Sequence, residues 1–282
     1  MNKPLLAIVA AALLSLLSCK EKSGDYKKLT NDPILYCKTV KDLNNVVLSN
    51  NFPPMVAARI YAYANIAAYE CIAAGDTGFQ SLAGQINGLE KLPAYDTANV
   101  DFHFASLLAF CKLSDALTFP AESFSEYIST LKKDADSAGM PSSVMKATVM
   151  FADSTAAHIL NWSKKDNYAQ TRSASKFTVT EEEGRWVPTP PMYAQGIEPH
   201  WMEIRTLVMD SVSQFNPVPP PVFDIKNKNS VYYKALLRVK QMTDSLTAEQ
   251  KHIADFWDDN PFKMNVSGHV MFATKKFLSP GD

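Results

Sequence analysis

Glycine is scarce in this chain, with only ten residues in 282, and the glycine patterns of several common active sites are absent. There is no Gly-x-Ser-x-Gly sequence, which in many hydrolases holds a nucleophilic serine on a sharp turn. There is also no glycine-rich loop of the kind that binds nucleotide phosphates through backbone amides. The sequence therefore supports neither a serine hydrolase of that type nor a P-loop protein.

The chain also carries almost no net charge. The chain has 28 lysine and arginine residues against 29 aspartate and glutamate residues, and no stretch concentrates the basic ones. Binding to nucleic acid depends on a strong positive field around the protein. We therefore expect no nucleic-acid partner. With 46% hydrophobic residues, the chain can nevertheless bury a substantial core.

Cysteine is limited to four residues, Cys19, Cys37, Cys71 and Cys111. Once Cys19 is set aside, an odd number remains, so these cysteines cannot all pair within the chain and no disulfide framework is indicated. The last three lie in apolar stretches with a helical pattern. We expect them to be small buried side chains and not reactive or metal-binding thiols.

The first residues have the three parts of a secretory signal: a basic start at Lys3, an apolar run, and small residues before Cys19. Leu16-Leu17-Ser18-Cys19 resembles the lipobox of bacterial lipoproteins, although an ordinary signal peptide with an accidental cysteine is the alternative. We expect residues 1–18 to be a signal peptide and residues 19–30 to be a lipidated Cys19 with a polar tether. Acyl chains on Cys19 would then anchor the protein to a membrane. The expected location is the cell envelope, on the outer membrane, facing the periplasm or the surface.

The rest of the chain is predicted to be a helical bundle, and hence all-α, because apolar residues recur at helical spacing in one segment after another. A long segment from Met55 to Ala74 is apolar nearly all round, and Gly75 can end it. Arg59, Asn65 and Glu70 place this segment inside a bundle and not in lipid. The remaining predicted helices span residues 33–49, 98–117, a stretch starting at Pro120, 142–162, 200–215, 230–243 and 247–258.

A proline-rich region interrupts the helices, since eight of the seventeen prolines lie between Pro188 and Pro221. Proline continues neither helices nor sheet ladders, so this region is predicted to be a crossing loop. Its aromatic residues, including Trp186, Tyr193 and Trp201, favour a loop packed on the bundle. In the last predicted helix, Ile253, Phe256 and Trp257 are expected to form a buried stripe.

Four strings together carry a resemblance to a known family. They are Phe52-Pro53-Pro54 with the helix that follows up to Glu70; Gly184-Arg185-Trp186 with its prolines; Glu198-Pro199-His200-Trp201; and Leu246-Thr247-Ala248-Glu249-Gln250 leading to Phe256-Trp257-Asp258-Asp259-Asn260-Pro261. In order and spacing they resemble the amino-terminal helical region of bacterial vanadium-dependent haloperoxidases, within the type 2 phosphatidic acid phosphatase superfamily. The resemblance implies that residues 31–282 form the amino-terminal half of a vanadium chloroperoxidase-like fold.

The resemblance also implies an active site that this sequence lacks. Relatives hold vanadate, or phosphate in the phosphatases, with a lysine followed by Arg-Pro, a Pro-Ser-Gly-His string, and a late arginine and histidine. None of the five arginines here precedes proline, and Ser267-Gly268-His269 follows Val266 in place of proline. His269 is the one candidate acid or base, but the cations such a role needs are missing. We therefore expect no catalytic residue and no cofactor in this chain, with the carboxy-terminal catalytic bundle absent.

A metal site is not expected either. His252 and Asp255 have the helical spacing that a metal can use, but we favour a solvated acidic helix end, because the pattern lacks the dense ligand set of a specific metal site.

Two functions remain open. The first is an exported lipoprotein of the haloperoxidase and acid phosphatase family, inactive alone, whose partner is the missing catalytic bundle or another copy; whether it is an enzyme stays uncertain. The alternative is a non-catalytic helical surface lipoprotein that binds a glycan, a peptide or a partner protein. A groove lined by Trp186, Tyr193 and Trp201 would favour the alternative. A large exposed apolar face on the last helices would favour a missing bundle.

Overall fold

The computed structural model describes residues 26–120, 122–190, 193–258, 262–267 and 270–275. They fall into two compact units. Unit 1 holds the chain up to Phe177 together with Ala194–Gln214, and unit 2 holds Thr178–Tyr193 together with the chain from Phe215 onward.

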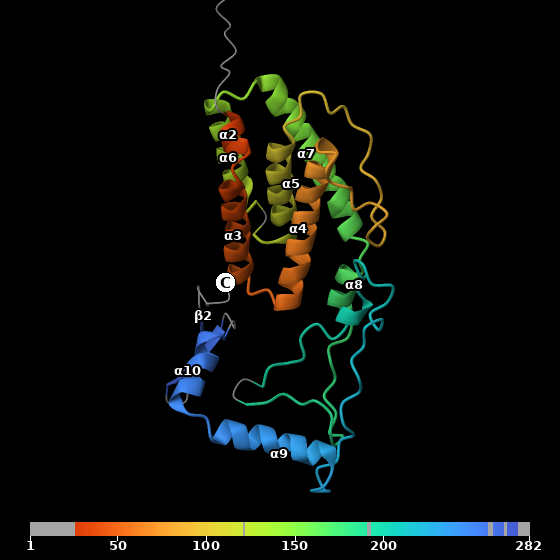
Figure 1. The fold of residues 1–282 in the computed structure, drawn as a ribbon, viewed down its shortest axis with the longest axis vertical. Coiled ribbons are helices and arrows are strands. Elements are labelled where there is room, and N and C mark those ends of the chain that lie inside the picture. Colours follow the sequence, from red (N-terminus) through yellow and green to blue (C-terminus); the bar gives the residue numbers. More distant parts are fainter. Residues whose placement is uncertain (1–25, 121, 191–192, 259–261, 268–269, 276–282) are drawn as a thin grey trace, which may run out of the picture. The chain divides into compact units, whose positions relative to one another are not determined.

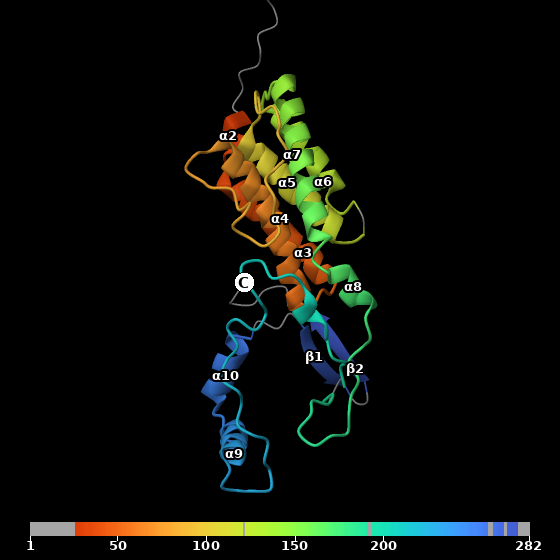
Figure 2. The same cartoon turned by 90° about the vertical axis from the view of Figure 1, so that its right-hand side faces the viewer.

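Unit 1 is a bundle of helices (Figures 1 and 2). Its elements are α2 (Tyr26–Thr30), α3 (Pro33–Ser49), α4 (Pro54–Gly75), α5 (Phe102–Leu117), α6 (Ser125–Ser137), α7 (Ser142–Ser163), α8 (Tyr168–Ser173) and the 3₁₀ turn η1 (Trp201–Glu203). Helix α5 packs against α4, α7, α3 and α6. The prediction of an all-α helical bundle is confirmed.

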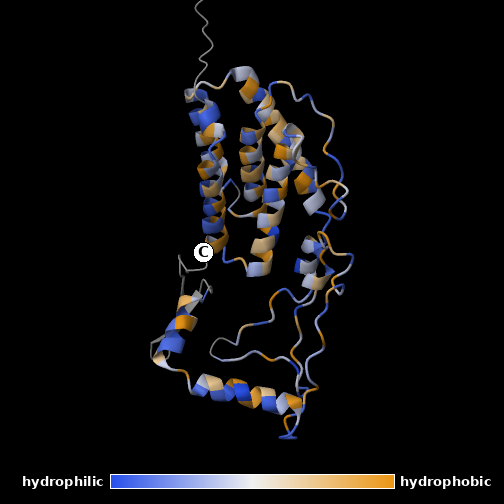
Figure 3. Cartoon of the chain, viewed as in Figure 1, coloured by the Kyte–Doolittle hydropathy of each residue, from blue (hydrophilic) through white to orange (hydrophobic). Residues whose placement is uncertain are grey.

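Helix α5 is the most enclosed element of this bundle, a position that its sequence explains. Phe104, Leu108 and Phe110 are completely buried, and most residues of the helix face other helices. Helix α4 packs against α5, and its Ala64 and Ala67 are fully buried, where their small side chains let neighbouring backbones approach closely. In Figure 3 both helices are coloured mostly white to orange, which marks their apolar character.

Buried polar side chains tie these helices together. Asp101 caps α5 by accepting from the backbone N–H of Phe104 at 2.9 Å, and it also accepts from the Thr30 hydroxyl at 3.2 Å. The backbone N–H of Asp101 in turn donates to the Thr148 hydroxyl of α7, 2.9 Å away. Asp101 therefore links α2, α5 and α7. These hydrogen bonds also give partners to polar groups that are buried.

The amino-terminal boundary differs from the predicted one. Residues 19–30 were expected to be a lipidated cysteine and tether, but α2 already begins at Tyr26. Thr30 is buried, and α2 packs against α6. The hydrogen bond from Thr30 to Asp101 attaches this short helix to the bundle. The polar sequence of the helix did not predict this contact.

The predicted helix over residues 200–215 is wrong, since only Trp201–Glu203 forms a 3₁₀ turn there. After this turn, the backbone forms hydrogen bonds with residues of the bundle and not within a helix of its own. The N–H of Arg205 donates to the carbonyl of Asp166 at 3.0 Å. The Asn87 side chain donates to the carbonyls of Thr206 and Met209. These tertiary bonds use the groups that a helix would have paired internally.

Unit 2 contains α9 (Val231–Asp244), α10 (Ala248–Phe256) and two antiparallel strands, β1 (Phe262–Ser267) and β2 (Val270–Lys275), paired from Phe262 with Lys275 to Ser267 with Val270. The strand pair was not predicted. The capping box at Thr247 and Gln250 is present as the sequence indicates.

No residue of α9 or α10 is buried. The predicted buried stripe is therefore wrong, because Ile253, Phe256 and Trp257 are 50%, 46% and 64% exposed. Figure 3 shows polar and apolar residues mixed along α9.

The proline-rich region divides between the units. Its segment Ala194–Gln214 belongs to unit 1, where Trp201 packs against the core cluster, in agreement with a packed crossing loop. Trp186 and Tyr193 belong to unit 2 and are 49% and 62% exposed. Within the described part of the chain, no helix has the length and apolarity needed to cross a bilayer.

Candidate functional site

The most strongly charged interior position of unit 1 lies where α4 meets the end of α7. Arg59 Nε donates to Asp166 Oδ2 across 2.7 Å, and its Nη2 donates to the Ser163 carbonyl at 3.3 Å. The side chains of Arg59 and Asp166 are only 9% and 2% exposed. Arg59 was predicted to lie inside a bundle, and the salt bridge explains how its charge is tolerated there.

A second arginine reaches the same position from the crossing loop. Arg205 donates from Nη2 to the Tyr63 hydroxyl at 3.0 Å, and Tyr63 donates to Asp166 Oδ2 at 2.8 Å. The Arg205 guanidinium lies 4.3 Å from the Trp162 ring centroid, in a cation–π contact. The four residues Arg59, Asp166, Tyr63 and Arg205 are called the arginine cluster below.

The arginine cluster carries more positive than negative charge. It holds two guanidinium groups but one carboxylate, because burial, followed by the nearby Asp166 charge, raises the pKa of Tyr63 above its usual value and keeps the phenol neutral. Arginine itself is always protonated in proteins. One positive charge therefore has no acidic counterpart within the cluster.

A cavity of about 580 Å³ opens beside the cluster, and all four of its residues line this cavity. Most of the remaining wall is apolar, from α4 and from the crossing loop, and includes Met55, Ala62, Ile204, Leu207, Met209 and Val212. A volume of this size lies in the range of small-molecule sites.

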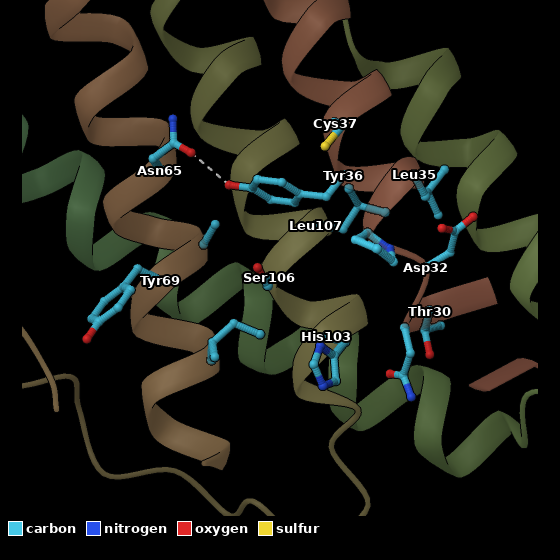
Figure 4. A pocket seen from close by; sticks show the side chains of 14 residues that line it. Thr30, Asp32, Leu35, Tyr36, Cys37, Asn65, Tyr69, His103, Ser106 and Leu107 are labelled. Carbon is cyan, nitrogen blue, oxygen red and sulfur yellow. Dashed lines mark hydrogen bonds between the residues drawn. The ribbon is translucent and has the colours of Figure 1, made fainter. Parts of the chain in front are cut away.

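A second cavity, of about 600 Å³, is a groove between α3 and α4 with α5 as its floor (Figure 4). Tyr36 reaches across it and donates to Asn65 Oδ1 at 2.9 Å. His103, Ser106 and Leu107 lie along the floor. Asp32 is among its lining residues and no lysine or arginine is, so its walls disfavour an anionic ligand.

The candidates taken from the sequence do not come together at either cavity. Cys19 and His269 lie outside the described residues. His252 and Asp255 lie on the exposed helix α10. Among the residues that the structure describes, no group of three or more His, Cys, Asp or Glu side chains is placed to hold a metal ion.

Two of the three cysteines among the described residues are buried, as predicted, and the third is exposed. Cys71 and Cys111 are buried, and burial raises the pKa of Cys71 to about 12 and that of Cys111 in the same direction. Cys37 was also expected to be buried but is exposed at the groove.

The sequence does not predict the arginine cluster as a unit. Arg59, Asp166 and Arg205 lie far apart in the chain, and no local spacing joins them. Charged residues inside otherwise apolar segments were the available signal. That signal located Arg59, but it did not indicate the partner in the loop after α7.

The fold matches the crystal structure described as that of the first bacterial vanadium-dependent iodoperoxidase. The TM-score is 0.74, the sequence identity is 38%, and the match covers 81% of this chain and 56% of that one. This chain belongs to the vanadium haloperoxidase and type 2 phosphatidic acid phosphatase superfamily. No protein-family model and no curated protein matches it. Because the match covers 56% of the iodoperoxidase, this chain spans little more than half the length of that relative.

The arginine cluster does not fit the cofactor of this relative. A vanadate or phosphate group carries several negative charges and needs several unpaired cations around it. In the arginine cluster Asp166 already neutralises one of two cations, and neither lysine nor histidine lines the cavity. We therefore assign no vanadate site to the described residues.

Proposed function

We propose that this chain is the helical scaffold of an exported, lipid-anchored member of the vanadium haloperoxidase and acid phosphatase family. In this proposal its polypeptide positions a catalytic bundle and does not itself hold the oxyanion. The relatives' reactions, peroxide-dependent halide oxidation or phosphate-ester hydrolysis, belong to the complete assembly. The supporting match to an iodoperoxidase, at 38% identity over 81% of this chain, carries the family assignment.

Inactivity of the chain alone is the first part of the proposal. It rests on two features: the absence of the Arg-Pro and Pro-Ser-Gly-His strings from the 282 residues, and the partial neutralisation of the arginine cluster by Asp166. Removing even one donor from a preorganised charge-stabilising site costs about 10²-fold in rate or more. Without the whole set, bromide or iodide oxidation by the purified chain should not rise above the rate with vanadate alone.

Docking of a catalytic helical bundle onto unit 2 is the second part. Helices α9 and α10 expose large apolar side chains that include Val231, Leu236, Val239, Met242, Ile253, Phe256 and Trp257. On α9, residues 231, 235, 239 and 242 recur at three- and four-residue spacing and so share one face. An exposed patch of this kind marks an interaction surface. The occupant we assign is a helical bundle equivalent to the part of the iodoperoxidase that lies outside the match.

Thiol labelling tests this docking. In a Cys37→Ser background, Val239→Cys lies on the face shared with Val231 and Met242, whereas Lys240→Cys lies about half a turn away from Val231 on α9. Both should react quickly with a maleimide in the 282-residue chain. When a catalytic bundle is present, only Val239→Cys should become protected. Equal labelling of the two positions in that assembly contradicts the proposal. Reading the gene beyond the codon for Asp282, for Arg-Pro and Pro-Ser-Gly-His, tests whether the bundle is part of the same polypeptide.

The lipid anchor is the third part, and it rests on the Leu16-Leu17-Ser18-Cys19 string. Two or more acyl chains hold a protein on a membrane durably, whereas one is marginal. The native chain should label with radioactive palmitate and sediment with membranes. Cys19→Ser should abolish both, and a labelled Cys19→Ser protein would overturn this part.

A non-catalytic binding protein is the competing function, and the groove in Figure 4 supports it. Tyr36, Tyr69 and His103 line the groove, and neither lysine nor arginine is among its lining residues. A neutral, partly apolar ligand such as an extended peptide suits these walls. A peptide that binds equally to the native chain and to an Ala68→Phe variant, which fills the groove, would count against this alternative.

A further inference from the structure

The cavity beside the arginine cluster has a composition that points to one class of ligand. We propose that it binds a small amphipathic monoanion, in which a carboxylate group is attached to an apolar body. The site is independent of the catalytic bundle discussed above, since every lining residue belongs to unit 1 of this chain.

Charge is the first reason. Arg59 and Arg205 both line the cavity, and Asp166 is the one carboxylate among its lining residues. Other acidic residues nearby have their own partners: Glu198 pairs with Arg172, and Glu203 pairs with His200. A single negative charge from a ligand would therefore bring the cluster to neutrality. A dianion would leave excess negative charge between apolar walls, which is unfavourable.

The partners of Arg205 are the second reason. Arg205 donates from Nη1 to the Trp162 carbonyl at 3.2 Å and from Nη2 to the Tyr63 hydroxyl at 3.0 Å. Both acceptors are neutral, so neither supplies a counter-charge. The Nε atom is buried and closed to a ligand. A carboxylate in the cavity, which Arg205 lines, would supply the missing negative charge to the guanidinium.

The apolar wall is the third reason. Met55 and Ala62 of α4 face the cavity together with Ile204, Leu207 and Val212 of the crossing loop. A simple inorganic anion would leave this surface in contact with water, whereas a short alkyl or aryl group would cover it. The cavity of about 580 Å³ has room for such a body.

Titration calorimetry on the 282-residue chain tests the proposal with three probes. Octanoate combines a carboxylate with an apolar body, octanamide is its neutral counterpart, and inorganic phosphate is an anion without the body. Octanoate should bind at one site, octanamide at least about tenfold more weakly, and phosphate not measurably, because binding needs both the charge and the apolar body. Equal affinity for octanoate and octanamide, tighter binding of phosphate, or no octanoate binding would each overturn the proposal.

Variants identify the site. Arg205→Gln removes the guanidinium, and Ala62→Phe fills the cavity while leaving both arginines in place. Each should weaken octanoate binding at least about tenfold. Arg185→Gln, which makes the same chemical change at an exposed arginine of unit 2, should leave it unchanged. If Arg205→Gln fails to fold, Ala62→Phe decides alone. Unchanged binding in the Ala62→Phe variant would place the octanoate elsewhere and refute the assignment.

Discussion

Arg59 on α4 and Asp166 after α7, 107 residues apart in sequence, form a salt bridge of 2.7 Å inside unit 1. The pair connects the first long helix of the bundle to the segment that receives the crossing loop, because the backbone carbonyl of Asp166 also accepts from Arg205. The Asp166 carboxylate accepts directly from Arg59 and is connected to the Arg205 guanidinium through the Tyr63 hydroxyl.

Replacing Asp166 with asparagine should destabilise the protein strongly. The change leaves the largely buried Arg59 without its counter-charge, and breaking a buried pair in this way costs about 3–5 kcal/mol. Chemical denaturation of unit 1, followed by circular dichroism, measures the free energy of unfolding. Asp153→Asn, which removes the partner of Lys112 in a more exposed pair, is the control and should cost less than about 1 kcal/mol. Equal losses for the two variants would contradict the account.

The Glu70 side chain should fix the position of the segment that connects α4 to α5. Its carboxylate is 2% exposed and accepts from the Ser81 hydroxyl and the Leu82 backbone N–H, each at 2.7 Å. Glu70→Ala leaves these donors without their acceptor and should cost about 1–3 kcal/mol. Hydrogen exchange at the Leu82 amide should also become faster. Glu126→Ala, on the exposed face of α6, should change neither quantity measurably; unchanged exchange in Glu70→Ala would show that the connection is held by other contacts.

His200 should make stability depend on pH. Its two ring nitrogens face the Glu203 carboxylate at 2.7 Å and the Ser175 carbonyl at 2.8 Å, so the doubly protonated ring satisfies both acceptors. The hydrogen bond to Glu203, and then the one to Ser175, raises the pKa of His200 above 6.5. A raised folded-state pKa gives stability that is complete below the unfolded value and is lost as pH rises through the folded value.

The measurement compares melting temperatures of the native protein and His200→Asn from about pH 5.5 to about pH 8.5. The difference between them should be largest at the acidic end and shrink as pH rises. His252→Asn, which makes the same chemical change on exposed α10, serves as the control. A His200→Asn difference that grows with pH would have the wrong sign for this interaction.

Thiol reactivity should separate the cysteines of the described residues. In a Cys19→Ser background, an aromatic disulfide reagent should modify Cys37 rapidly, because that thiol is exposed. Cys71 and Cys111 should react only on unfolding, since burial removes access and raises the pKa of both thiols. Rapid modification of two or more thiols in the folded chain would be inconsistent with the buried positions.

The long helices α3, α4, α5 and α7 of unit 1 were predictable because their evidence is local. Asp32 before Pro33 and the alanine-rich run before Gly75 both mark helix ends that the structure confirms. The capping box at Thr247 is a local pattern as well. Such signals depend on residues three or four positions apart, which a sequence displays directly.

Features that depend on distant partners were not predictable in the same way. Residues after Trp201 have an apolar spacing typical of a helix, yet Asn87 and Asp166 bond to their backbone and hold them in an irregular path. Thr30 is buried because Asp101 lies beside it, 71 residues away. The arginine cluster depends on three such long-range contacts, so only the fold brings it together.

We infer that these residues support the fold of the family without holding its oxyanion. Equilibrium dialysis of vanadate against the purified 282-residue chain tests this inference, with the metal measured in both compartments. Equal vanadate concentrations are expected on the two sides. One vanadate retained per chain, and released by excess phosphate, would contradict the inference.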